Sequence, residues 1–71
     1  MNLINVLESL SEEDAKRINI FSKNYAFLLK GSREELLKIL RVDLKLCEVL
    51  RVTSDSFGKI IILDMEAKKN V

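Results

Sequence analysis

Apolar residues recur at helical spacing through the first part of the chain. Residues 3–10 place four of them on one face and predict a short N-terminal helix. Ser11 then precedes three consecutive acidic residues, as is typical of a capped helix start, where carboxylates complement the helix dipole. We expect a long helix that ends at Gly31. Its apolar stripe consists of Ile18, Phe21, Tyr25, Leu28 and Leu29.

A second long helix is predicted from Ser32, because Glu35 follows three residues later and completes a capping box. Its continuation through residues 41–53 has three interpretations. Residues 41–46 alternate charged and apolar side chains, as a strand would. A helix-turn-helix would turn at residues 41–43. A single uninterrupted helix would carry the stripe Leu36, Ile39, Val42, Leu46, Val49 and Leu50.

The stretch SFGKIIILDM, residues 56–65, has four consecutive branched aliphatics after a glycine and predicts a strand over residues 59–64. A lone strand leaves its backbone groups unpaired, so it needs a neighbour. Residues 49–53 could supply one as a hairpin. If the preceding helix instead runs through Thr53, the remaining partner is the same strand of a second molecule. This antiparallel dimer contact, which we favour, would use Ile60, Ile61, Ile62 and Leu63.

These patterns together predict a mainly α fold with a C-terminal β-strand, a small α+β arrangement of two longer helices and one short N-terminal helix. Residues 1–65 are expected to form one domain, and the polar residues 66–71 a flexible tail. A chain of 71 residues buries a small core, and its single cysteine excludes an internal disulfide. The 48% of apolar residues therefore favours a homodimer.

Charge and hydropathy limit the classes of partner. The formal net charge is +1, and basic and acidic residues are balanced along the chain, so no basic arm attracts nucleic acid. The longest strictly apolar run, residues 60–63, is far shorter than the roughly 20 residues that span a bilayer. The N-terminal residues do not resemble a secretory signal. We expect a cytoplasmic protein without membrane contact.

Few residues favour catalysis. The chain has no histidine, so Cys47 has no imidazole to activate it, and its apolar surroundings predict a buried small residue. The acidic run Glu12, Glu13 and Asp14 is explained by the helix start rather than by a metal. Neither glycine belongs to a phosphate-binding loop. We predict a protein that is not an enzyme and that needs no cofactor or metal.

Protein binding is the function that we predict. Ile20, Phe27 and Phe57 lie off the helical stripes, and apolar residues outside a small core often mark a contact surface. The chain is accordingly interpreted as a small non-catalytic regulatory module that binds an unidentified protein and also itself, as a homodimer.

The alternative is a DNA-binding transcriptional regulator. Residues 36–50 resemble a helix-turn-helix in outline, with apolar residues where two short helices would meet. The motif favours a small residue where this chain has Leu37 and glycine where it has Arg41. Under this alternative residues 33–52 would carry the motif, and Arg41, Lys45 and Arg51 would contact DNA. No family resemblance extends over the whole chain.

Overall fold

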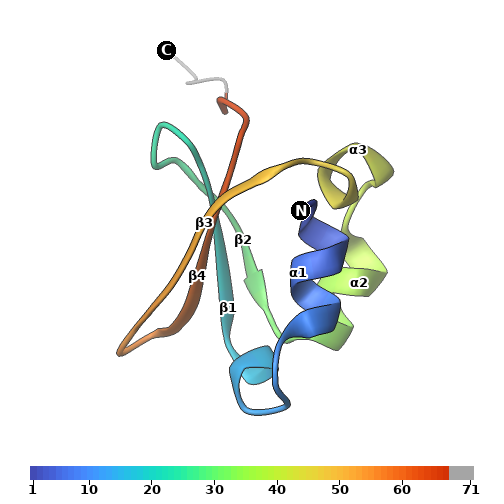
Figure 1. Ribbon diagram of the computed structural model, residues 1–71, viewed down its shortest axis with the longest axis vertical. Coiled ribbons are helices and arrows are strands. Elements are labelled where there is room, and N and C mark those ends of the chain that lie inside the picture. The colour runs from blue at the N-terminus through green and yellow to red at the C-terminus, as the bar shows by residue number, and fades with distance from the viewer. Residues whose placement is uncertain (68–71) are drawn as a thin grey trace.

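Four strands form one mixed sheet, and the helices lie on one of its faces (Figure 1), in a computed structural model that describes residues 1–67. The elements in chain order are α1 (Leu3–Ser9), the 3-10 turn η1 (Asp14–Lys16), β1 (Ile18–Ser22), β2 (Phe27–Gly31), α2 (Arg33–Ile39), α3 (Val42–Lys45), β3 (Val49–Asp55) and β4 (Gly58–Leu63). Strands account for 37% of the described residues and helices for 31%. The prediction of a mainly α fold was therefore wrong, and the protein is a small α+β fold.

The sheet is built from two hairpins. Its strand order is β2-β1-β4-β3, in which β1 pairs with β2 and β3 with β4 in antiparallel fashion. The hairpins meet along the parallel pairing of β1 with β4, which aligns Ile18 with Lys59 and Ser22 with Leu63. The strands β2 and β3 consequently form the two edges of the sheet.

The long helix expected over residues 11–31 is replaced by η1, β1 and β2. The Ser11 hydroxyl does accept a hydrogen bond from the Asp14 N–H at 3.2 Å, but only a three-residue 3-10 turn follows, and its N-cap is Glu13, which makes no side-chain capping bond. In β1 the side chains of Ile18, Ile20 and Ser22 are buried on the helix side of the sheet, while Asn19 and Phe21 are only partly buried. This alternation has the period of a strand, and it brings both isoleucines into the core.

The second half of the chain also departs from a long helix. The capping box predicted at the start of α2 is confirmed, because the Ser32 hydroxyl accepts from the Glu35 N–H at 3.2 Å and the Glu35 carboxylate accepts from the Ser32 N–H at 3.1 Å. However, α2 ends at Ile39, and α3 is a helix of four residues. Residues 49–55 then form β3. Residues 33–52 therefore contain neither an uninterrupted helix nor the second helix of a helix-turn-helix.

The strand predicted over residues 59–64 is observed as β4, in the hairpin that was one of its two expected pairings. Asp55 aligns with Gly58 across a two-residue loop of Ser56 and Phe57. Because β4 lies between β1 and β3, both of its edges are paired within the chain. A second molecule has no free edge of β4 to pair with, which corrects the expected dimer contact through residues 60–63.

The core lies between the sheet and the helices. The short N-terminal helix predicted from residues 3–10 is confirmed as α1, which contributes Leu3 and Leu7 to this core. Its fully buried apolar side chains come from both layers and are Leu3, Leu7, Ile18, Ile20, Leu36, Ile61 and Leu63. The helices thus cover one face of the sheet, and within residues 1–67 no element covers the other.

The last described residue, Ala67, lies beside the turn between β1 and β2. The backbone N–H of Ala67 donates to the side-chain oxygen of Asn24 at 3.4 Å. The flexible tail predicted for residues 66–71 falls mostly outside the described residues. Among the helices described, none has the length and apolar character needed to cross a bilayer.

Candidate functional site

The sheet face that points away from the helices is not covered by any described element (Figure 1). We call it the outer face, and define it by two rows of residues aligned across the four strands. One row is Phe27, Phe21, Ile62 and Arg51, and the other is Lys30, Asn19, Ile60 and Thr53. The first row is apolar over three strands, and the second is mostly polar.

The centre of the outer face is aromatic and aliphatic. The rings of Phe21 and Phe27 meet edge to face, with centroids 5.7 Å apart and planes at 74°. This geometry is favourable for an aromatic pair. Phe27 nevertheless leaves 54% of its surface exposed, and nearby Tyr25, which has a positive φ of 61°, leaves 71% exposed. These rings expose a large apolar surface to solvent.

A hollow of about 270 Å³ opens on the outer face. Its floor is apolar and its rim toward β3 is polar. The residues that line it are Phe21, Tyr25, Arg51, Thr53, Asp55, Ile60 and Ile62. Small-molecule sites usually have volumes of roughly 300–1,000 Å³. The hollow is below this range, and suits a single large side chain better than a whole ligand.

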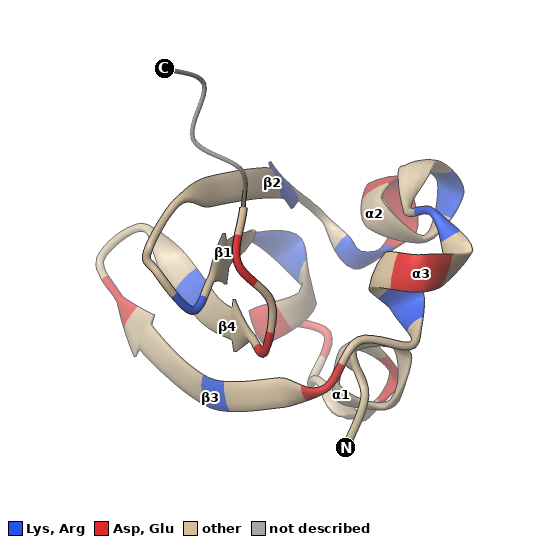
Figure 2. Cartoon of the chain, turned by 90° about the horizontal axis from the view of Figure 1, so that it is seen from above, with Lys and Arg blue, Asp and Glu red and all other residues tan. Residues whose placement is uncertain are grey.

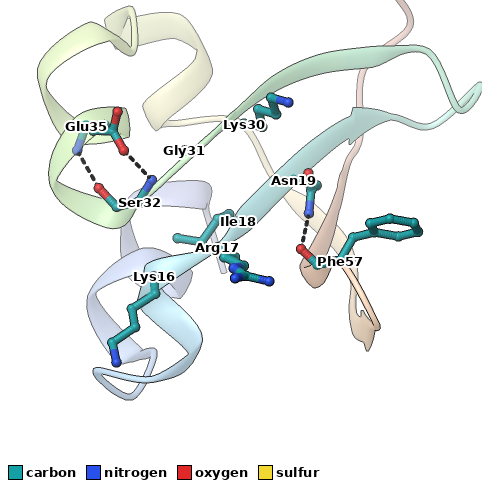
Figure 3. Close-up of a pocket in the computed structure, with 9 residues that line it drawn as sticks. All are labelled: Lys16, Arg17, Ile18, Asn19, Lys30, Gly31, Ser32, Glu35 and Phe57. Atoms are coloured by element: carbon teal, nitrogen blue, oxygen red, sulfur yellow. Dashed lines mark hydrogen bonds between the residues drawn. The ribbon is translucent and has the colours of Figure 1, made fainter.

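A second, more polar cleft of about 430 Å³ lies where β1 and β2 meet the start of α2 (Figure 3). Its lining residues are Lys16, Arg17, Ile18, Asn19, Lys30, Gly31, Ser32, Glu35 and Phe57. Lys16 and Lys30 extend in different directions from the cleft, and the Lys16 ammonium lies 3.0 Å from the Glu13 carboxylate. The positive charges therefore do not converge on one point.

The carboxylate in this cleft has a structural task. Hydrogen bonds from the Ser32 backbone and hydroxyl hold the pKa of the Glu35 carboxyl below its ordinary value of 4.5. Glu35 is thus ionised near neutral pH, and it acts as the second half of the capping box. A general acid or base needs a pKa near the working pH, so Glu35 is poorly suited to proton transfer.

The residues considered for metal binding or nucleophilic chemistry are dispersed. Glu12, Glu13 and Asp14 form separate ion pairs with Arg33, Lys16 and Lys59, at 2.8, 3.0 and 3.6 Å. Within residues 1–67, no three acidic or cysteine side chains are grouped so that they could hold a metal ion. Burial raises the pKa of the Cys47 thiol, which keeps it protonated and weakly nucleophilic near neutral pH.

The residues predicted to contact a partner do not share one surface. Phe27 lies on the outer face, as do Ile60 and Ile62, although only 7% of Ile62 is exposed. Phe57 is 74% exposed, but it belongs to the loop between β3 and β4 and lines the polar cleft. Ile20 is buried in the core, together with Ile61 and Leu63, so these three cannot reach a partner.

The basic residues of the DNA-binding alternative are also separated. Arg41 precedes α3 and lies 3.5 Å from the Asp43 carboxylate, and Lys45 ends the same helix. Arg51 lies on β3, where it lines the hollow of the outer face. Figure 2 shows basic and acidic positions scattered over both layers of the molecule.

Phe21 and Tyr25 were not recognised as surface residues, because both fit the apolar stripe of the expected helix. The alternation in INIFS, residues 18–22, was the available signal, since it places Phe21 on the face opposite Ile18 and Ile20. No family model, curated protein or solved structure matches this chain. The outer face is therefore identified from its geometry alone.

Proposed function

We propose that the protein is a small non-catalytic regulatory module that acts as a homodimer and binds another protein through the outer face of its sheet. The observation that carries this proposal is the apolar row of Phe27, Phe21 and Ile62, in which Phe27 is 54% exposed, Phe21 is partly exposed and Ile62 lies buried beneath its neighbours. An exposed contiguous apolar patch on a small protein commonly marks an interaction site.

The composition of the outer face supports a protein partner. Protein interfaces typically combine an aromatic centre with a polar rim, and a few anchored side chains provide most of the affinity. Here Phe21 and Phe27 form the centre, while Arg51, Thr53 and Asp55 border the hollow. A partner would insert one large apolar side chain into the hollow and form hydrogen bonds at the rim.

Duplex DNA recognition through residues 33–52 loses its physical basis, because α3 is one turn long and is followed by a strand. Aromatic residues on an open sheet face can instead stack the bases of a single strand. On this face the negative charge of Asp55 offsets the positive charge of a nearby basic residue, and the hollow has an apolar floor. Both features favour a protein over a nucleic acid as the ligand. A single-stranded nucleic acid is the competing ligand that an experiment must test.

The proposal can be tested by site-specific photo-cross-linking in the cells that produce the protein. A benzophenone side chain would replace Phe27 on the outer face or, as a control, the exposed Lys38 on α2. A protein captured at position 27 but not at position 38 would then be purified. We expect Phe27→Asp to weaken its binding by tenfold or more in calorimetry, as for an interface anchor.

The matched control is Val42→Asp, since Val42 is 69% exposed on α3 and belongs to the helical layer. We expect this variant to bind as the wild type does. Binding that is lost with Val42→Asp and retained with Phe27→Asp would place the contact on the helices and refute the proposal. Tight binding of a mixed single-stranded oligonucleotide, weakened by Phe27→Asp, would replace protein with nucleic acid as the ligand.

A further inference from the structure

The strand β3 has β4 on one edge. At the start of its other edge the Val49 N–H donates to the Met1 carbonyl at 2.9 Å, and among the described residues the remainder of that edge, residues 51–55, has no strand partner. The strand β3 spans seven residues, whereas the opposite edge strand β2 spans five. The pairing of β3 with β4 has one register shift, between Val49 and Arg51. Residues 51–55 therefore keep a regular register with β4. Regular edge strands readily pair with another strand, and proteins usually block them with proline, lysine or inward-pointing charges. Residues 51–55, RVTSD, contain neither proline nor lysine.

Two hydrogen bonds reveal which way the backbone groups of β4 point. The Lys59 N–H donates to the Arg17 carbonyl, on the side of β1, at 2.8 Å. The Asp64 N–H donates to the Glu48 carbonyl, on the side of β3, also at 2.8 Å. Because these directions alternate along a strand, the even-numbered positions of β4 direct their backbone groups toward β3.

The same alternation fixes the free edge of β3. Arg51, Thr53 and Asp55 align with the even-numbered positions 62, 60 and 58, so their backbone groups point toward β4. The backbone N–H and C=O groups of Val52 and Ser54 consequently point away from the sheet. They are the groups available to another strand.

A two-fold antiparallel pair must place these outward groups opposite one another. The axis can then pass through Val52, Thr53 or Ser54. With the axis at Val52, Arg51 lies opposite Thr53 of the second copy, and with the axis at Ser54, Asp55 lies opposite Thr53 of the second copy. Only the axis at Thr53 brings Arg51 opposite Asp55 of the second copy, and symmetry forms this pair twice.

We infer that the protein dimerises by antiparallel pairing of β3 with β3 of a second copy, about a two-fold axis at Thr53. Opposite charges directly across a strand pair are favourable, and like charges are not. This register satisfies the outward groups of Val52 and Ser54 and complements both charges at the edge. The partially exposed Val52 side chain, at 40%, gains a neighbour on the helix side of the sheet.

This inference rests on the homodimer in the proposed function, and it specifies the surface that forms it. Arg51, Thr53 and Asp55 line the hollow, so their side chains are on the outer face. Edge pairing leaves Phe21 and Phe27 uncovered, because they lie on β1 and β2. The outer faces of the two copies would join into one continuous surface for the proposed partner.

Sedimentation equilibrium on the full chain tests the register by charge reversal. We expect the wild type to be a dimer. Arg51→Glu and Asp55→Arg each place like charges opposite one another twice and should each weaken the dimer about tenfold or more. The double variant, with both substitutions, restores opposite charges and should recover wild-type dimerisation. Lys45→Glu, on α3, changes charge away from the edge and should leave the dimer unchanged.

Val52→Pro provides a second variant that does not depend on charge. It removes an N–H that points outward, and an edge strand tolerates proline at such a position. We expect a folded monomer, with folding checked by circular dichroism. A wild type that remains monomeric at several hundred micromolar would overturn the inference. So would a dimer that withstands both Val52→Pro and the single charge reversals.

The two proposals can fail separately. If Phe27→Asp dissociates the dimer and Arg51→Glu does not, the copies meet through their outer faces and the edge register is wrong. If Val52→Pro dissociates the dimer and partner binding does not depend on Phe27, the edge is the dimer contact and the outer face is not the partner site.

Discussion

The backbone of Gly58 lies directly against the backbone of Arg17. A Cβ atom built on Gly58 would be 2.5 Å from the Arg17 carbonyl oxygen and 2.6 Å from the Arg17 Cβ atom. The same carbonyl accepts a hydrogen bond from the Lys59 N–H at 2.8 Å. The end of the β3–β4 hairpin is thereby held against the start of β1, where the parallel pairing begins.

Gly58→Ala should consequently be strongly destabilising. The position has a φ of +121°, which side chains rarely adopt, and the new methyl group would collide with backbone that cannot move freely. We expect the free energy of unfolding to fall by about 3 kcal/mol in urea denaturation. The control is Ser56→Ala in the exposed loop that precedes Gly58, for which we expect a change within about 0.5 kcal/mol. Equal effects of the two variants would contradict the close packing.

Ile20 and Ile39 distinguish the observed fold from the helical one. Ile20 is fully buried in β1, whereas Ile39 is 59% exposed at the end of α2, although the sequence pattern placed Ile39 on an apolar stripe and Ile20 off it. Ile20→Ala should reduce the free energy of unfolding by about 2–5 kcal/mol. Ile39→Ala should change it by less than about 1 kcal/mol. The reverse order in thermal or urea unfolding would restore the helical interpretation.

Arg33 links the end of α1 to the start of α2. Its guanidinium donates to the carbonyls of Leu7 at 3.2 Å and Leu10 at 2.9 Å, and it pairs with the Glu12 carboxylate at 2.8 Å. Arg33→Ala leaves both carbonyls without this donor, and we expect a loss of about 2 kcal/mol in the free energy of unfolding. Glu12→Gln removes only an exposed ion pair and should cost less than about 1 kcal/mol. If Glu12→Gln lowered the free energy of unfolding more than Arg33→Ala did, the ion pair rather than the two carbonyl hydrogen bonds would be the source of the stability.

Glu35 makes the free energy of unfolding depend on pH in the acidic range. Because its pKa in the folded state is below the ordinary value of 4.5, its contribution is present above that value and is lost as the pH falls through the lowered pKa. Glu35→Gln keeps a capping side chain but cannot titrate. We expect the free energy of unfolding of this variant to fall less than that of the wild type between pH 5 and pH 3. Parallel curves for the two proteins would show that Glu35 is not linked to folding.

Local signals identified the starts of elements better than their type. Ser32 caps α2 through its hydroxyl, as predicted, whereas the Ser11 hydroxyl accepts from the Asp14 N–H but is not the N-cap of η1. Ser32 starts a helix because Leu36 and Leu40 can pack against the core on that face. After Ser11 only one turn forms, since the isoleucines that follow reach the core by alternation rather than on a helical stripe.

The sheet could not be derived in full because the pairing that decides it joins distant segments. The turn between β1 and β2 contains no glycine or proline, and Tyr25 takes the positive φ instead, so the usual turn signal is missing. The hairpin of β3 and β4 was a recognisable alternative, since Gly58 follows its loop. The set of residues on the outer face depends on which strand pairs with β1. The sequence alone does not indicate that this strand is β4.

The parallel pairing of β1 and β4 divides the molecule into two halves of similar design. Each half contributes helical residues and one local hairpin, and only this pairing joins the hairpins into a sheet. We expect such a distant contact to form late in folding, because closing the long segment between the strands costs conformational entropy. Until then β1 and β4 each offer an apolar edge to any nearby chain. If this pairing fails to form, two molecules can exchange their halves by domain swapping, or they can aggregate. The pairing of β1 with β4 prevents both.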